Sequence, residues 1–221
     1  MTGANSSRES RVQGFLAQGK AEQSNAIVAA AYELMNEGGL EGLTIRAVLK
    51  RTGLARRAFY ERFAGKDDLV LALFAQAMRY AADMFENLIA PMPDPIKRLK
   101  AIVNSLGRGA GSPNEPSTTE SSRMASAMSR EHMRLAEARP EELGAALQPL
   151  FRLIARQIAD GIAAGKVRQA DPERLALFIY NLIATTVHTE LISRDAAEGA
   201  AKLREQLADE LWDFCYRGIA A

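Results

Sequence analysis

Residues 44–63 read TIRAVLKRTGLARRAFYERF, and this stretch decides the fold of the chain. Thr44 is a good N-cap residue, and it precedes a short apolar pattern with helical spacing formed by Ile45, Val48 and Leu49. Gly53 interrupts the pattern, and a second short helix is predicted between residues 55 and 63. Two short helices joined by a glycine-containing turn predict a helix-turn-helix.

The two predicted helices separate apolar from basic side chains. The apolar inner face consists of Ile45, Val48, Leu49, Leu54, Ala58 and Phe63, and Phe59 is expected to join it. The side chains left for the outside are Arg46, Lys50, Arg56, Arg57, Tyr60 and Arg62. The major groove of DNA admits one α-helix, and arginine suits both guanine edges and phosphates. The pattern favours a DNA-binding surface, although a merely solvated basic face stays open on these residues alone.

The charge distribution indicates the same surface. The whole chain of 221 residues has a formal net charge of only +1. Residues 1–66 hold ten Lys and Arg against six Glu, a net charge of +4, which leaves −3 for the remainder. Between Thr44 and Lys66 there are seven basic residues and one acid, Glu61. A short basic segment on a mildly acidic body is typical of a protein that binds a polyanion.

The rest of the chain reads as helices with no useful β-alternation. Residues 1–22 are polar and without periodicity, which predicts a mobile tail. A first helix is expected from Ser24 to the glycines at 38 and 39, and a long one from Asp67 to about Ala90. Further helices are expected at 94–108, 123–138, 140–165, 171–194 and 196–216, with a loop at 109–122. The prediction is an all-α fold of about nine helices, divided into a tail (1–22), a three-helix helix-turn-helix domain (23–66) and a helical C-terminal domain (67–221).

Several classes of protein are disfavoured by composition. Cys215 is the only cysteine, so an intrachain disulfide is excluded and a reducing, cytoplasmic setting is expected. We expect neither an export signal nor a membrane span. His132 and His188 are the only histidines, and their surroundings lack the spacing of metal ligands. Because phosphate-binding loops and nucleophile motifs are also missing from the sequence, we expect no enzyme, no metal and no cofactor.

The segment LTIRAVLKRTGLARRAFYERFAGKDDL, residues 43–69, resembles the DNA-binding signature of the TetR (tetracycline-repressor-like) family of bacterial regulators. The resemblance covers about residues 24–74 and rests on the Thr44 cap, the glycine in the turn, the Phe59-Tyr60 pair, Phe63 and the Lys66 segment. Leu49, Ala55 and Ala58 depart from the small or hydroxyl residues usual at these positions. The departures at Ala55 and Ala58 leave more of the DNA recognition to Arg56 and Arg57.

The resemblance implies a set of DNA contacts. Thr44, Tyr60 and Lys66 would contact phosphates, Arg46 would lie near the backbone, and Arg56 and Arg57 would read bases. Whether Arg8 and Arg11 in the predicted tail reach a minor groove stays open. The partner would be double-stranded DNA that carries an inverted repeat.

The resemblance also implies that the C-terminal domain binds a small effector and forms a homodimer through its last two helices. The residues expected at the dimer interface are Leu175, Ile179, Leu182, Leu203, Leu207, Leu211, Trp212 and Phe214. The residues expected to line an effector pocket are Phe85, Leu88, Val103, Met124, Met128, Phe151 and His188. An ordinary core position remains the alternative for each pocket residue, and for His188 in particular a core histidine bonded to a carbonyl.

The functional expectation is a dimeric transcriptional regulator that does not cross a membrane. It would repress by binding a palindromic operator and would be released by a small, hydrophobic effector of unknown identity. The fourth helix, residues 68–90, would couple the two domains by family resemblance. The alternative is a DNA-binding regulator of the nucleoid or of division that needs no effector.

Overall fold

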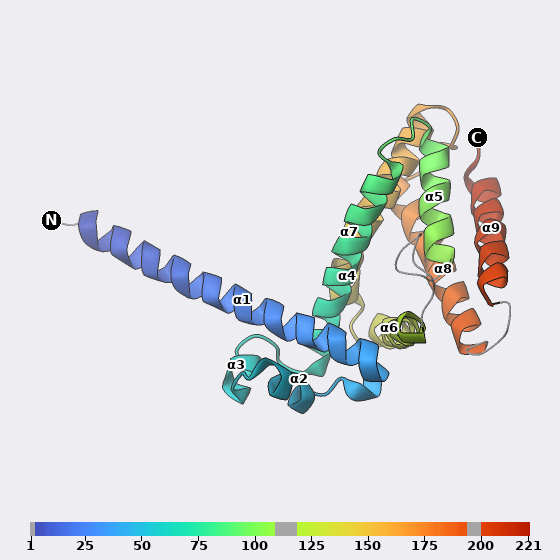
Figure 1. The fold of residues 1–221 in the computed structure, drawn as a ribbon. Coiled ribbons are helices and arrows are strands. Elements are labelled where there is room, and N and C mark those ends of the chain that lie inside the picture. Colours follow the sequence, from blue (N-terminus) through green and yellow to red (C-terminus); the bar gives the residue numbers. More distant parts are fainter. Residues whose placement is uncertain (1–2, 109–118, 194–199) are drawn as a thin grey trace. The chain divides into compact units, whose positions relative to one another are not determined.

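The computed structural model describes residues 3–108, 119–193 and 200–221, and within these ranges the chain forms nine α-helices and no strand (Figure 1). The helices are α1 (Gly3–Gly42), α2 (Ile45–Thr52), α3 (Arg56–Tyr60), α4 (Lys66–Ile89), α5 (Pro95–Gly107), α6 (Thr119–Ala138), α7 (Pro140–Ala163), α8 (Pro172–Ser193) and α9 (Ala200–Ile219). The all-α prediction is confirmed.

The chain divides into two compact units, a first unit of Met1–Leu73 and a second unit of Phe74–Ala221. The division falls inside α4, so this helix begins in the first unit and ends in the second. The first unit therefore extends seven residues past the boundary that the sequence predicted at residue 66.

The first helix differs from its prediction. Residues 3–22, expected as a tail, are helical and continue without a break into the predicted helix. The glycine pair expected to end that helix instead produces a kink at Gly39, whose φ of 63° and ψ of −156° are not helical. The polar composition of the N-terminal residues hid the helix because helical periodicity needs a buried face to be visible. The side chains of Arg8 and Arg11 lie outside the described residues.

The core of the first unit forms where α1 packs on α2. Its fully buried side chains include Ile27 and Met35 from α1, Leu43 from the connection, and Val48 from α2. Apolar residues three to four positions apart on α1 form one stripe, which packs on α2. The helix-turn-helix thus rests on a hydrophobic base that leaves its other side to solvent.

In the second unit α5 lies between α7 and α9, and α8 packs on α6 and α7 (Figure 1). Helices α5 and α9 lie close together at Gly107, where an added Cβ would lie 3.1 Å from the Ala208 Cα. Prolines at the first positions of α5, α7 and α8 suit the starts of these helices. Among the described residues no helix is long and apolar enough to cross a membrane.

Candidate nucleic-acid interface

The start and end of α2 are fixed by two local interactions. The Thr44 hydroxyl accepts a hydrogen bond from the Ala47 backbone N–H at 3.1 Å. At the other end Gly53 has a left-handed φ of 67°, and its N–H donates to the Leu49 carbonyl at 3.0 Å. Glycine adopts this conformation without the steric cost that a Cβ would add. The exposed Thr44 hydroxyl still has its own proton to donate, which suits a phosphate oxygen.

The short helix α3 is held by one aromatic side chain. Phe59 is completely buried, with its ring centroid 5.5 Å from Phe63 and 5.4 Å from Tyr60. Ala55 precedes the helix and supplies no capping hydrogen bond, as its side chain requires. Because a five-residue helix is unstable in isolation, packing through Phe59 must stabilise it. The expected core position of Phe59 is confirmed.

Two arginines on α3 are exposed, and each is oriented by the residue four positions later. The Arg57 side chain is 90% exposed, and its Nε donates to the Glu61 carboxylate at 2.9 Å. The Arg56 guanidinium lies 5.4 Å from the centre of the Tyr60 ring, with its Nη2 3.4 Å from the Tyr60 hydroxyl. Pairs at this spacing share one helix surface, so each guanidinium is partly preorganised while its remaining N–H groups face solvent.

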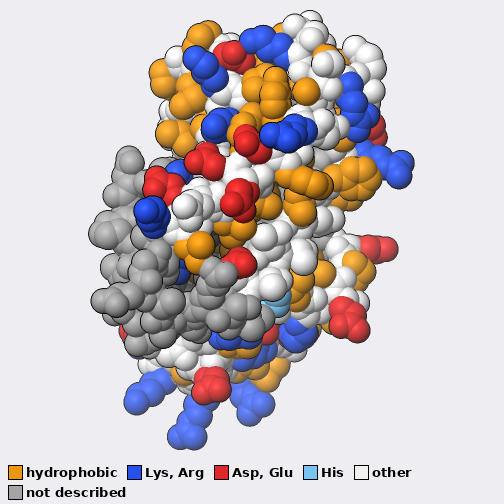
Figure 2. Space-filling view, turned by 90° about the vertical axis from the view of Figure 1, so that its right-hand side faces the viewer, with side chains coloured by type: hydrophobic (Ala, Val, Ile, Leu, Met, Phe, Trp, Pro, Cys, Tyr) orange, Lys and Arg blue, Asp and Glu red, His pale blue; other side chains and the backbone are white. Residues whose placement is uncertain are grey.

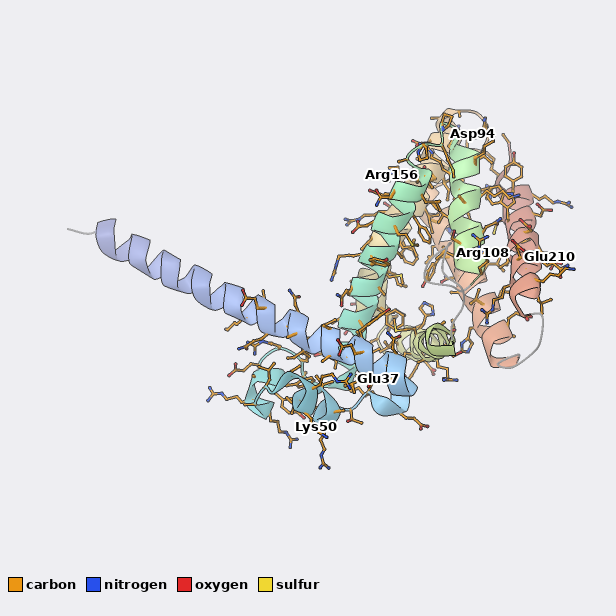
Figure 3. The ribbon with its side chains drawn as sticks, in the orientation of Figure 1. Glu37, Lys50, Asp94, Arg108, Arg156 and Glu210 are labelled. Atoms are coloured by element: carbon orange, nitrogen blue, oxygen red, sulfur yellow. The ribbon has the colours of Figure 1, made fainter. Side chains whose placement is uncertain are left out.

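Helix α2 adds two more exposed cations. Arg46 and Lys50 are exposed, and Lys50 projects away from the first unit (Figure 3). Figure 2 shows several Lys and Arg side chains projecting from the region of α2 and α3. Together with the α3 arginines they place four exposed basic side chains on the helix-turn-helix, the arrangement that phosphate binding requires.

Arg62 was predicted to face outward, and this prediction is wrong. Its side chain is only 8% exposed, and its guanidinium donates to the Gln23 side chain and to the backbone carbonyls of Lys20 and Ala58. Two of these acceptors belong to α1, so Arg62 fastens the segment after α3 to the first helix. Sequence patterns could not reveal this contact, because the two α1 partners lie about forty residues away along the chain.

Two further basic residues are held by interactions within the first unit. Both Arg51 terminal nitrogens donate to the Glu37 carboxylate at 2.8 Å, and one also reaches Glu33 at 3.4 Å. The hydrogen bonds from Arg51 lower the pKa of Glu37. Glu37 belongs to α1, beside α2 (Figure 3), and this forked pair joins the two helices. The half-buried Lys66 donates to the Leu40 carbonyl at 3.1 Å, which leaves two of its N–H groups for another acceptor.

Comparison with known proteins identifies this region. Residues 27–73 match the family described as bacterial regulatory proteins, tetR family. This stretch of the chain, which contains the helix-turn-helix, therefore has the N-terminal sequence of the tetR family. It is also similar to the class A tetracycline repressor protein from transposon 1721 of Escherichia coli, with 43% identity over 56 residues. That similarity covers 25% of this chain and 26% of the repressor, so the chain spans about a quarter of the curated relative that it matches.

Solved structures resemble the chain over most of its length. A TetR-family transcriptional regulator from Pectobacterium atrosepticum is 20% identical with a TM-score of 0.66, over 92% of this chain and 97% of its own. RolR, solved in complex with resorcinol, is 15% identical with a TM-score of 0.64, over 91% of this chain and 96% of its own. At these identities the likeness shows a shared fold.

The residues predicted to line an effector pocket come from five helices of the second unit, α4 to α8. Phe85 and Val103 are buried, whereas Leu88, Met128, Phe151 and His188 are half-buried. The side chain of Met124 lies outside the described residues. The His188 Nδ1 lies 2.8 Å from the Ser129 hydroxyl, so its partner is a side chain and not the carbonyl that the core alternative supposed.

A cluster of rings in the second unit was not foreseen from the sequence. His132 on α6 lies between Phe74 on α4 and Tyr180 on α8, with ring centroids 6.2 Å and 5.7 Å apart. Tyr180 continues to Phe151 on α7 at 5.0 Å. We call these four residues the ring cluster. Only Phe151 was among the predicted pocket residues, because spacing along one helix does not reveal rings that meet from four helices.

The predicted dimer residues separate into two groups. Leu175, Ile179, Leu211 and Trp212 are buried within the single chain. Leu182 and Leu207 are half-buried, and Leu203 and Phe214 are exposed. Two residues that the prediction omitted, Leu177 and Phe178, are also exposed on α8. Apolar residues surround α8 on nearly every side, so periodicity could not separate its inner from its outer face.

Proposed function

We propose that this chain is a homodimeric tetR-family repressor that binds an inverted-repeat operator and is released by a small, hydrophobic effector. The observation that carries the proposal is the pair of oriented, exposed arginines on α3, inside the region that matches the family. A matched family of regulators, rather than of enzymes, agrees with this proposal.

The side chains of the helix-turn-helix divide between positioning and reading. Thr44 and Tyr60 present hydroxyl groups, and Arg46, Lys50 and Lys66 present cations, for phosphate oxygens. Arg56 and Arg57 stand on the helix that would enter the major groove, where an arginine can contact a guanine O6 and N7 together. Glu61 would hold the Arg57 guanidinium until DNA replaces the carboxylate as its partner.

Exposed apolar residues on the last two helices support a dimer. Leu177 and Phe178 on α8 and Leu203 and Phe214 on α9 are large hydrophobic side chains open to solvent, with Phe214 70% exposed. A second copy would cover the same patch on each chain in a two-fold interface. Two DNA-binding units related by that axis would recognise two half-sites of opposite orientation, which is why we propose an inverted repeat.

Effector control requires two conformations that bind the effector unequally, since equal binding shifts no population however tight it is. Helix α4 begins in the DNA-binding unit and ends in the second unit, so we propose it as the coupling element. Buried apolar and aromatic side chains in the second unit favour a hydrophobic effector. The solved complex of RolR with resorcinol is a precedent for an aromatic ligand on this fold.

The proposal is tested with the double variant Arg56→Ala/Arg57→Ala against DNA that carries the inverted repeat nearest its own gene. If both arginines read bases, affinity falls by at least about a hundredfold, at roughly 1–3 kcal/mol for each lost base contact. The matched control is Arg152→Ala/Arg156→Ala, which removes the same charge from exposed positions on α7. Unchanged binding by the first variant, or an equal loss in the control, contradicts the proposed interface.

Mapping the genomic sites of the protein separates repression from the alternative role in the nucleoid or in division. A regulator of transcription occupies a few promoters that contain the palindrome. Many dispersed sites without a common palindrome would favour the alternative and would remove the need for an effector.

A further inference from the structure

The ring cluster contains a buried polar atom that no described residue satisfies. His132 is 8% exposed, and its Nδ1 has no hydrogen-bond partner among the residues that the structure describes. Six residues earlier on α6, Ser126 is 6% exposed, and within the same described part of the chain its hydroxyl also has no partner. Buried polar groups in native proteins are nearly always hydrogen-bonded, so two such groups on one helix require an explanation. Ser129, which lies between them on α6, does have a partner in His188.

The surroundings of His132 favour an uncharged ligand. Burial lowers the pKa of His132, with a smaller contribution from the neighbouring His188, so the imidazole is neutral at physiological pH. Burial also raises the pKa of Tyr180, which keeps its phenol protonated. Glu131, the adjacent buried carboxylate, is already paired with Arg134 at 2.7 Å. An anionic ligand would therefore meet no uncompensated positive charge from these groups.

The hydrogen-bonding capacity of His132 further narrows the class of ligand that would suit this site. A neutral imidazole either donates or accepts at Nδ1 according to its tautomer, and a hydroxyl group can satisfy both forms because it donates and accepts. The other members of the ring cluster, Phe74, Tyr180 and Phe151, offer faces and edges that suit an aromatic ring. Phe151 is only half-buried, so the cluster approaches solvent on the α7 side.

We propose that His132 anchors the hydroxyl group of a small, neutral aromatic ligand whose ring packs among Phe74, Tyr180 and Phe151. Its role as the effector site rests on the proposed function, whereas the binding itself does not. The ligand supplies the missing hydrogen bond to Nδ1 and separates rings that come from α4, α6, α7 and α8. Phe74 belongs to α4, and the first residues of α4 belong to the DNA-binding unit. Separating the rings therefore acts on a helix that is part of both units.

The test compares phenol with toluene, which has nearly the same size and lacks the hydroxyl, by calorimetric titration of the full-length protein. We expect phenol to bind at one site per chain about fivefold to tenfold more tightly than toluene, the effect of one net hydrogen bond. In His132→Phe, which keeps an aromatic ring and removes the nitrogen, the preference is lost and toluene affinity is unchanged. An equal loss of the preference in His188→Phe, where the Nδ1 is already bonded to Ser129, would contradict the assignment of the anchor to His132.

A second measurement uses the unaltered chain and does not depend on a variant folding correctly. The chain has two histidines, so a long-range proton–nitrogen spectrum of the imidazoles contains two ring systems. Phenol moves the His132 Nδ1 resonance, and toluene does not. Three results would overturn the proposal: equal affinity for the two probes, no phenol binding at tens of millimolar, or an Nδ1 resonance that reports the same hydrogen bond before and after phenol is added. The third result would mean that ordered water already satisfies the nitrogen.

These outcomes are separable from the proposed function. Phenol binding at His132 without any change in operator affinity keeps the site and removes its role in effector control. Failure of operator binding by the unaltered protein contradicts the proposed function and leaves the phenol result standing.

Discussion

Replacing Arg62 and Arg57 separately by methionine should give opposite results, although the two residues are five positions apart in one basic segment. The Arg62 guanidinium is buried and bonded to Gln23 and to two carbonyls, so its loss leaves these acceptors without their donor. Hydrogen bonds to a charged group contribute roughly 1.5–3 kcal/mol each, offset in part by the cost of burying the cation. We therefore expect Arg62→Met to lower the free energy of unfolding by about 2–4 kcal/mol.

Arg57 has the opposite environment. Its side chain is 90% exposed, and it pairs with Glu61 one turn away. Such a pair contributes at most about 0.5 kcal/mol, so Arg57→Met should leave stability nearly unchanged. Urea unfolding followed by circular dichroism measures both variants, and operator binding is measured well below their melting temperatures. We expect Arg57→Met to lose at least about tenfold in operator affinity, and Arg62→Met to retain affinity within a few-fold. A fully stable Arg62→Met that no longer binds the operator would refute this reasoning.

Three further predictions each rest on the surroundings of one residue. Gly53→Ala should cost about 1 kcal/mol because φ is 67° there, whereas Gly65→Ala, also with open space around its Cβ, should cost much less; urea unfolding compares them. The pKa of Glu37 is lowered, so its pair with Arg51 stabilises the protein at pH values above the ordinary Glu pKa of about 4.3. This stabilisation is lost as the pH falls through the pKa of Glu37 in the folded protein, so the stability difference between wild type and Glu37→Gln should shrink below about pH 4. Burial raises the pKa of Cys215 to about 11, so iodoacetamide should label the native thiol far more slowly than the urea-unfolded one.

The helix-turn-helix could be predicted from the sequence because its determinants are local. A capping threonine lies next to the helix that it caps, and a left-handed glycine lies in the turn that needs it, so Thr44 and Gly53 were interpretable one at a time. The buried Phe59 followed from its spacing to the other apolar positions. Each of these features depends on residues within one or two turns of helix.

Features that depend on distant partners could not be predicted in the same way. The buried orientation of the Arg62 side chain depends on Gln23 and Lys20 from α1. This part of the helix is polar and shows no periodic apolar pattern. The ring cluster depends on four helices meeting around His132. Which face of α8 is buried depends on the neighbouring helices that cover it within one chain. Because the sequence of α8 is apolar on nearly every side, it does not indicate which face is covered.

The structure changes what the basic segment implies about DNA binding. The sequence contains seven basic residues between residues 44 and 66, but in the structure Arg62 is buried and Arg51 is held by two carboxylates. Arg46, Lys50, Arg56 and Arg57 are exposed, and the half-buried Lys66 is a fifth candidate. The slope of log affinity against log salt is about −0.9 for each neutralised phosphate. Seven contacts on each of two DNA-binding units would give a slope near −13, whereas five give at most about −9. A measured slope well beyond −9 would mean that Arg51 or Arg62 leaves its partners on DNA, or that residues of α1 before Gly19 join the interface.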